Sequence, residues 1–231
     1  MARRSFAVIG LGRFGAATAT TLVELGQDVI GIDGSEDKVR EMSDALLQAV
    51  QLDATDERAL RAAGIQNVDV AVISIGEDIE SSLLVVMLVK ELGIPTIIAK
   101  AVTPLHGRIL QKLGVSRVIF PEREMAQRLA HSLVVPNVLD YIELSRDFSI
   151  VELPAPQEFV GKTLKQLELR PRYGLTLIAV KRPGTGGVVT NISPSADDII
   201  HEGDVLALLG SNEKLAQLGR LHPVEKKEIR L

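Results

Sequence analysis

The sequence predicts an α/β fold, a Rossmann-like doubly wound parallel sheet followed by a second, smaller α+β lobe. Three observations lead to this prediction. Short apolar runs alternate with helical stretches from residue 5 to residue 134. A glycine-rich turn joins the first apolar run to the first helical stretch. Aromatic residues make up 3% of the chain and hydrophobic residues 46%, which favours the aliphatic core of parallel strands covered by helices.

The elements of the N-terminal part follow from this alternation. Strands are expected at 5–9, 28–32, 48–52, 69–75, 96–100 and 117–120, and helices at 13–25, 36–46, 56–63, 78–92, 103–113 and 122–134. Because parallel strands are joined by right-handed crossovers, the six strands are expected in the order 3-2-1-4-5-6.

The pattern changes after residue 136 to shorter β-type segments. These lie at 139–144, 149–153, 175–181 and 205–209, with turn clusters at 182–187 and 193–195 and a last helix at 211–221. Ser211 is the expected N-cap of that helix. The sequence therefore predicts an N-terminal Rossmann nucleotide-binding domain over residues 1–136, a C-terminal α+β domain over 137–223 and a polar tail over 224–231.

The turn after the first strand has the spacing of a phosphate-binding loop. Gly10 permits the tight turn, Gly12 lets the backbone approach a pyrophosphate, and Gly15 lets the helix pack close to the strand. Unpaired N–H groups at the start of that helix favour an anion. Asp33 ends the second strand, where a carboxylate can accept hydrogen bonds from ribose hydroxyls. The alternative is a glycine turn that binds no ligand.

Further candidates lie at the other strand ends, because ligands of open parallel sheets bind beyond the carboxyl ends of the strands. Asp53 would accept the exocyclic amine of adenine or, alternatively, cap the helix at 56–63. Lys100 and Glu122 would meet phosphate and a metal or, alternatively, form a surface ion pair. Arg13 inside the loop favours a terminal phosphate over a nicotinamide. The expected nucleotide-binding residues are Gly10, Leu11, Gly12, Arg13, Phe14, Gly15, Asp33, Gly34, Lys38, Asp53, Ala54, Thr55, Ser74, Ile75, Gly76, Lys100 and Glu122, and Glu122 is also the expected metal ligand.

Composition excludes several classes of function. The formal net charge of −4 argues against nucleic acid as the main partner. The chain has no cysteine, which excludes disulfides, thiol catalysis and cysteine-ligated metals. The 4 histidines share no metal-ligand spacing, and no Ser-His-Asp pattern is present. The residues therefore give no sign of thiol, Ser-His-Asp or metal-centred catalysis.

The expected location follows from the apolar runs. The longest run, 83–89, is far shorter than the ~20 residues of a membrane helix. The first strand begins by residue 5 and leaves no room for a signal peptide. We expect a soluble, cytoplasmic protein with no direct membrane insertion. Because the run 83–89 leaves its helix without a polar face, we also expect its outer side to be covered by another subunit or, alternatively, by the second lobe.

With these motifs placed, the chain resembles the cytosolic gating subunits of Ktr/Trk-type potassium uptake systems, which are built from RCK domains (regulator of K⁺ conductance). The resemblance covers nearly the whole chain. The matching stretches are 10–15, 29–33, 53–55, 74–76, 90–95, 121–122, 137–142, 149–152 and 172–174.

The resemblance implies an octameric ring built from dimers, docked beneath a membrane potassium-translocating subunit at the inner face of the cell membrane. It implies a swapped crossover helix near 122–134 and binding of ATP and ADP, with NAD(H) as a further occupant. Arg13 would reach the terminal phosphate from the neighbouring subunit. Glu122 would help to hold a divalent cation, Mg²⁺ or Ca²⁺, beside the phosphates.

In relatives the C-terminal lobe can bind cyclic di-AMP in a groove between two subunits. Arg170, Arg172 and Thr176 occupy the corresponding stretch of this sequence. Thr176 stands where the family motif has an asparagine, which counts against cyclic di-AMP binding by this chain.

These expectations favour a regulatory subunit in which ATP and ADP shift the conformation of the ring. The first alternative is an NAD(H)-dependent oxidoreductase or an NAD-sensing regulator, because many loops of this kind serve dehydrogenases. The small second lobe offers no evident acid/base pair beside a nicotinamide. A redox-sensing repressor would need a basic helix-turn-helix element, and none is evident in the sequence.

Overall fold

The computed structural model describes residues 3–76, 78–134, 138–184 and 186–221. The chain separates into two compact units, residues 1–122 and 123–231, and each is described by itself. The expected domain boundary between residues 136 and 137 and the expected tail at 224–231 both lie outside the described residues.

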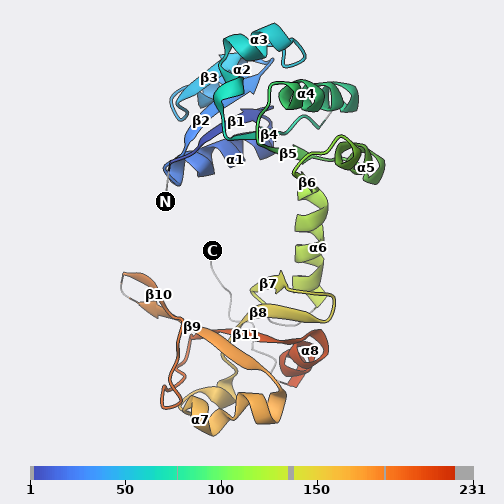
Figure 1. Ribbon diagram of the computed structural model, residues 1–231. Helices are drawn as coiled ribbons and strands as arrows, with labels where there is room; N and C mark the ends of the chain where they lie inside the picture. Colours follow the sequence, from blue (N-terminus) through green and yellow to red (C-terminus); the bar gives the residue numbers. More distant parts are fainter. Residues whose placement is uncertain (1–2, 77, 135–137, 185, 222–231) are drawn as a thin grey trace. The chain divides into compact units, whose positions relative to one another are not determined.

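The first unit is built on a six-stranded parallel sheet in the order β3-β2-β1-β4-β5-β6 (Figure 1). Its strands are β1 Ser5–Ile9, β2 Asp28–Asp33, β3 Gln48–Gln51, β4 Val70–Ile73, β5 Thr96–Lys100 and β6 Arg117–Ile119. The connecting helices are α1 Arg13–Glu24, α2 Glu36–Met42, α3 Glu57–Ala62, α4 Ile79–Glu91 and α5 Pro104–Lys112, and α6 Pro121–Val134 follows β6. The fold class and the strand order are as predicted.

Each face of this sheet has its own hydrophobic core, because successive side chains of a strand point to opposite faces. Along β1, Ala7 and Ile9 pack with side chains of α3, α4 and α5, whereas Val8 packs with side chains of α1 and α2. Residues of β4 alternate in the same way between the two clusters. Helices thus cover both faces of the sheet. The carboxyl ends of the strands remain accessible to a ligand.

The second unit contains a five-stranded antiparallel sheet in the order β10-β9-β11-β8-β7. Its strands are β7 Asp140–Glu143, β8 Phe148–Pro154, β9 Thr176–Gly184, β10 Gly187–Asn191 and β11 Val205–Ser211. Short helices η2 Gln157–Phe159, α7 Leu164–Leu167 and η3 Leu169–Tyr173 connect β8 to β9, and α8 Asn212–Leu221 ends the unit. Phe159, Leu208 and Leu215 are among the buried side chains of its core.

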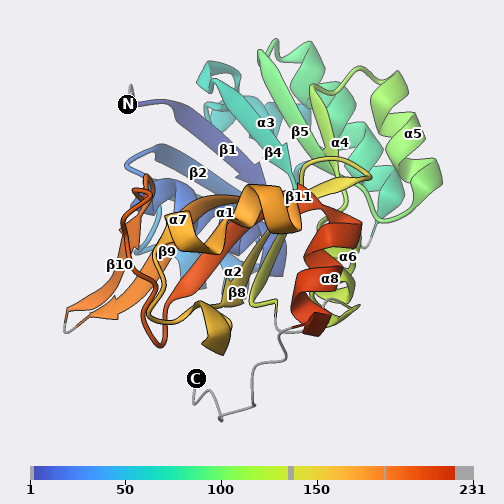
Figure 2. The same ribbon diagram turned by 90° about the horizontal axis from the view of Figure 1, so that it is seen from below.

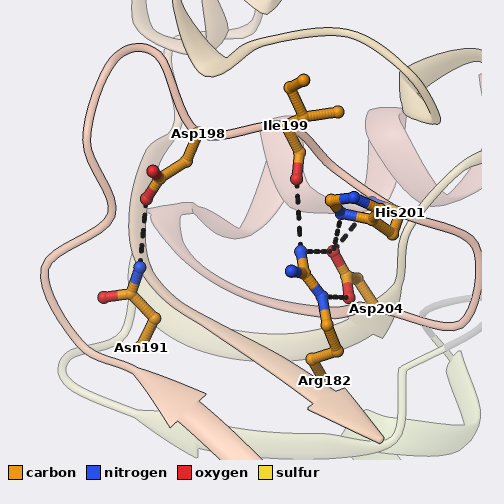
Figure 3. Close-up of polar contacts among 6 residues, drawn as sticks. All are labelled: Arg182, Asn191, Asp198, Ile199, His201 and Asp204. Atoms are coloured by element: carbon orange, nitrogen blue, oxygen red, sulfur yellow. Dashed lines mark hydrogen bonds and ion pairs between the residues drawn. The ribbon is translucent and has the colours of Figure 1, made fainter.

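An ion pair fixes the connection between β10 and β11 in this unit. Asp204, which is fully buried, accepts hydrogen bonds from Nε and Nη2 of Arg182 at 2.7 and 2.8 Å (Figure 3). Asp204 also accepts from the backbone N–H of His201 at 2.8 Å, and Arg182 Nη2 donates to the carbonyl oxygen of Ile199. A buried carboxylate with all of these partners ties the end of β9 to the start of β11.

Two elements differ from the prediction. The expected turn cluster at 182–187 is largely strand, because β9 runs to Gly184 and β10 begins at Gly187. The second helix ends at Met42 instead of residue 46, and the Ser43 hydroxyl donates to the carbonyl oxygen of Arg40 at 2.8 Å. That side-chain hydrogen bond competes with continuation of the helix. Among the described residues, no helix combines the length and the apolar character needed to cross a bilayer.

Candidate functional site

The carboxyl ends of the strands in the first unit surround a pocket of about 850 Å³. It lies where β1 and β4 are neighbours in the sheet, the place where the crossovers change direction and where sheets of this kind bind nucleotides. Of the predicted nucleotide-binding residues, all except Leu11 and Gly15 line it. The structure therefore brings residues from six strand ends into one site.

The glycine loop has the geometry that its sequence predicts. Gly10 has φ +97°, a conformation that favours glycine, and its N–H donates to the carbonyl oxygen of Ile32 at 2.7 Å. A Cβ on Gly15 would lie 1.8 Å from the carbonyl oxygen of Gly10, so this glycine permits the close approach of α1 to the loop. No side chain caps α1 at Gly12, and its first turn carries no acidic residue. The start of α1 is thereby available to an anion.

Leu11 and Gly15 support the loop without lining the pocket. Leu11 is buried, and its backbone N–H donates to Asp33 Oδ2 at 2.7 Å. The carboxylate of Asp33 also accepts from the N–H of Ser35 at 2.9 Å and lies 3.5 Å from Nζ of Lys38. These bonds hold Asp33 at the pocket wall, and a carboxylate has about four acceptor positions, which leaves capacity for a ribose hydroxyl.

At the far end of the pocket, Lys100 and Glu122 form an ion pair, with Nζ and Oε1 2.5 Å apart. The lysine side chain is 13% exposed and the glutamate 69%. The hydrogen bond from Lys100 lowers the pKa of Glu122, and its own backbone N–H and the charges of Lys100 and Arg13 act in the same direction. Two cations and one carboxylate thus lie at this end, and of the two expected roles the structure shows the ion pair.

Asp53 lines the pocket and does not cap the helix that follows. Its Oδ1 accepts hydrogen bonds from the N–H and the hydroxyl of Thr55, and these bonds lower its pKa. Asp56 is the N-cap of α3 and accepts from the N–H groups of Arg58 and Ala59. The alternative role considered for Asp53 therefore belongs to Asp56.

The pocket is lined by further residues that sequence analysis did not select. They are Ile9, Ile32, Gln51, Leu52, Ser81 and Val102. Five of them directly adjoin a selected residue or lie two positions from one, so extending each strand-end motif by a residue or two would have found them. Ser81 lies on α4 and bonds its cap, Asp78.

Glu122 is the residue predicted to bind a metal ion. Within the described part of the chain, no three His, Asp or Glu side chains gather in a way that could hold a metal ion. Mg²⁺ is commonly bound by one or two carboxylates together with substrate phosphates. Glu122 would therefore bind a divalent cation only together with phosphate oxygens, which would supply further metal ligands.

The residues expected at a cyclic dinucleotide groove lie in the second unit. Arg170 and Arg172 belong to η3, Thr176 begins β9, and all three are exposed. Exposed arginine side chains on one short helix are available to an anion.

Comparison with known proteins agrees with this fold. Residues 6–121 match the TrkA-N domain and residues 148–222 match the TrkA-C domain. The chain is 43% identical over 209 residues to Ktr system potassium uptake protein C of Bacillus subtilis, covering 90% of this chain and 93% of that protein. It is 39% identical over 212 residues to Ktr system potassium uptake protein A of the same organism, covering 92% and 94%.

Solved structures share the fold. The GsuK RCK domain superposes with a TM-score of 0.64 at 21% identity, over 98% of this chain and 49% of that one. The Kef C-terminal domain of Shewanella denitrificans, solved in an AMP-bound form, matches 56% of this chain and 79% of that one with a TM-score of 0.50 and 25% identity. The chain belongs to the RCK-domain family of Ktr- and Trk-type potassium uptake proteins, with a TrkA-N and a TrkA-C domain.

Proposed function

We propose that this chain is a nucleotide-binding regulatory subunit that gates a membrane potassium-translocating partner, with ATP and ADP as its ligands. One observation carries the proposal: a single pocket joins an uncapped glycine-loop helix start, the carboxylate of Asp33 and the cations Lys100 and Arg13. The names of the Ktr relatives support potassium uptake as the process that is regulated.

An adenine nucleotide fits the order of groups along the pocket. Asp53 and Thr55 lie at the end of β3, beyond Asp33 at the end of β2, where the adenine and ribose of a bound nucleotide belong. The diphosphate would lie on the start of α1 at Gly12. Lys100 and Glu122 then meet the last phosphate and its divalent cation, a role that suits a triphosphate better than a nicotinamide.

Binding of the triphosphate would change the partners of Lys100 and Glu122. A phosphate has more negative charge than the Glu122 carboxylate and competes for the lysine ammonium. Glu122, the second residue of α6, is then free to bind the cation that neutralises the phosphates. The contacts of ATP and ADP differ at this end of the site, and differential contacts are what shift a conformational equilibrium.

The assembly proposed for the protein is an octameric ring of dimers in the cytoplasm, docked on the membrane partner. Support comes from the outer face of α4, where the side chains of Leu84 and Met87 are 40% and 46% exposed although the helix buries Val85, Val86 and Val89. Apolar side chains in this position are typical of a surface that another subunit covers.

Calorimetric titration of the purified chain with ATP, ADP and NADH, with and without Mg²⁺, tests the proposal. We expect ATP and ADP to bind at one site per chain, and Mg²⁺ to tighten ATP binding in the wild type but not in E122Q. Native mass spectrometry of the same samples reports the size of the assembly. Absence of binding by both ATP and ADP would overturn the proposed function.

A second candidate is an NAD(H)-sensing regulator with the same partner. The size of the pocket favours it, because about 850 Å³ lies near the upper end of the range of roughly 300–1,000 Å³ for small-molecule and cofactor sites, where a large ligand is expected. NADH binding at least tenfold tighter than both ATP and ADP would select this candidate. Oxidation of NADH in the presence of small carbonyl substrates would instead indicate an oxidoreductase.

A further inference from the structure

A buried histidine lies behind one wall of the pocket. Val102 follows β5 and lines the pocket, and its backbone N–H points to Nδ1 of His106 at 3.5 Å. His106 lies in the first turn of α5 and is 1% exposed. The backbone N–H of His106 donates to Oγ1 of Thr103, the N-cap of α5, at 3.1 Å. The imidazole is therefore fixed by the turn at 101–103 and touches the backbone of the residue that forms the wall.

The other ring nitrogen has no hydrogen-bond partner in the part of the chain that the structure describes. Because Nδ1 accepts a hydrogen bond, the proton of the neutral ring lies on Nε2. Nε2 is buried, and within the described residues neither it nor the hydroxyl of Ser82 has a hydrogen-bond partner. Ser82 is fully buried on α4, the helix that packs beside α5 (Figures 1 and 2). Buried polar atoms without partners are uncommon in native proteins and call for an explanation.

We propose that neutral His106 is a positioning residue that holds the wall at Val102, and that its protonation in acid releases this wall and weakens nucleotide binding. The proposal rests on the proposed function, because Val102 and Lys100 belong to the end of the pocket assigned to the last phosphate.

Protonation changes the contact directly. The imidazolium carries N–H groups on both nitrogens, so Nδ1–H would face the N–H of Val102 and the attraction would become a repulsion. The added charge would also be buried without an acceptor, since Nε2 has none among the described residues. Both effects favour movement of the turn at 101–103 away from its position in the neutral state.

Among the residues that the structure describes, no charged side chain offsets this cost at the ring. Burial lowers the pKa of His106, and desolvation is the sole cause of the shift. The ionisable side chains on the neighbouring elements are Glu80, Lys90 and Glu91 on α4, Lys100 on β5 and Arg117 on β6. Arg108 and Lys112 are on α5 itself, and all of these except Lys100 are exposed.

The sign of the effect follows from linkage. A ligand that needs the wall in place binds the neutral ring, so nucleotide affinity falls as the pH decreases toward the pKa of His106 in the folded protein, which burial places below the ordinary histidine value of about 6.5. By reciprocity, bound nucleotide makes protonation of His106 still less favourable.

The test compares ADP affinity from pH 5.0 to 7.5 in the wild type, H106N and H106L. The amide oxygen of asparagine can accept the Val102 N–H in place of Nδ1 but does not titrate, whereas leucine keeps the apolar volume and removes the acceptor. H201N, which changes an exposed histidine of the second unit, is the control and is expected to keep the wild-type profile.

At pH 7.5 we expect H106N to bind ADP like the wild type and H106L to bind more weakly. Between pH 7.5 and 5.0 the wild type is expected to lose roughly threefold or more in affinity relative to H106N. Dividing the ADP affinity of the wild type by that of H106N at each pH cancels the effect of titration of the ADP phosphates. Parallel profiles for the wild type and H106N would overturn this inference alone, whereas absence of ADP binding by the wild type at pH 7.5 would overturn the proposed function.

Discussion

At the glycine loop, two glycines three residues apart differ in what a methyl group would meet. A Cβ on Gly12 meets no atom within 4 Å, whereas a Cβ on Gly15 lies 1.8 Å from the carbonyl oxygen of Gly10. We therefore expect G12A to fold with a loss of less than about 1 kcal/mol in the free energy of unfolding. The same variant is expected to bind ADP at least about tenfold more weakly, because the methyl group occupies the approach of the phosphates.

G15A is the matched variant. We expect it to lose more stability than G12A and less of its ADP affinity. The clash with backbone requires α1 or the loop to shift, at a cost of roughly 1–3 kcal/mol in the free energy of unfolding. Denaturant titration and ADP calorimetry on both variants separate stability from binding. Tight ADP binding by G12A would contradict the assignment of the loop to the phosphates.

The Arg182–Asp204 pair predicts sensitivity of the second unit to acid (Figure 3). Burial raises the pKa of Asp204, but the hydrogen bonds from Arg182 and His201 and the charge of Arg182 together lower it below the usual value. A carboxyl whose pKa is lowered by folding stabilises the native state above the unfolded pKa of about 3.9. That stabilisation is lost as the pH falls through the folded pKa.

We expect D204N to lower the free energy of unfolding at pH 7 by about 2–3 kcal/mol, since Arg182 loses its charged acceptor and the amide places N–H groups against the guanidinium. Below pH 3 the difference from the wild type should shrink. D197N, which changes an exposed carboxylate, is the control. Equal stability of D204N and the wild type at pH 7 would show that the pair contributes nothing.

At the residue scale, sequence analysis succeeded where a backbone requirement dictates the residue. Gly10 needs a positive φ and Gly15 needs the absence of a Cβ, so the loop could be predicted from spacing. Asp53 and Asp56 could not be distinguished as helix caps, because both precede the same helix and the choice depends on the turn at Thr55. The histidine at position 106 gave no signal, since burial depends on packing against elements distant in the sequence.

Among the elements, α4 has an outer face that predicts self-association. Leu84 and Met87 are exposed on a helix whose other side is buried in the sheet core. We expect the double variant L84E/M87K to form a smaller assembly than the wild type, as measured by light scattering after size exclusion. Charged side chains on an apolar subunit contact are costly to bury.

L47E is the control for this variant, because Leu47 is 67% exposed and lies outside α4. It should keep the wild-type assembly. An unchanged assembly in L84E/M87K, with the fold retained by circular dichroism, would exclude the α4 face as a subunit contact.

Elements were predictable in proportion to the strength of their hydrophobic pattern. The four inner strands β1, β2, β4 and β5 contain buried apolar residues, whereas the edge strands β3 and β6 contain none, and all six positions agree with the prediction to within a few residues. Strand β10 was missed because all five of its residues are exposed and it begins at a glycine, so no apolar alternation marks it. It forms because it pairs antiparallel with β9, and this pairing depends on tertiary context.

For the molecule as a whole, the site could be predicted because topology brings scattered motifs together. Six strand ends meet at one edge of a parallel sheet whatever the loops contain, so spacing along the chain is enough to assemble them. The ion pair between Lys100 and Glu122 could not be distinguished from a ligand site in advance, because a lysine and a glutamate can pair with each other or with a phosphate and its cation.

The proposed gating determines how strongly each site must prefer ATP over ADP. Shifting a two-state ring from mostly closed to mostly open takes about 5.5 kcal/mol of differential binding, or about 0.7 kcal/mol per site when eight sites act together. That corresponds to roughly a threefold preference for ATP over ADP at each site. Arg13, an exposed cation close enough to Glu122 to lower its pKa, is placed to supply this difference at the last phosphate.

We therefore expect R13A to bind ADP with wild-type affinity and to lose its preference for ATP, as measured by calorimetry on the assembled protein. R58A, which removes an exposed arginine from α3, should keep the preference. If R13A weakened ATP and ADP binding equally, Arg13 would contribute uniform binding and could not shift the ring. Because ATP and ADP share every group except the last phosphate, the preference can come from no other part of the ligand.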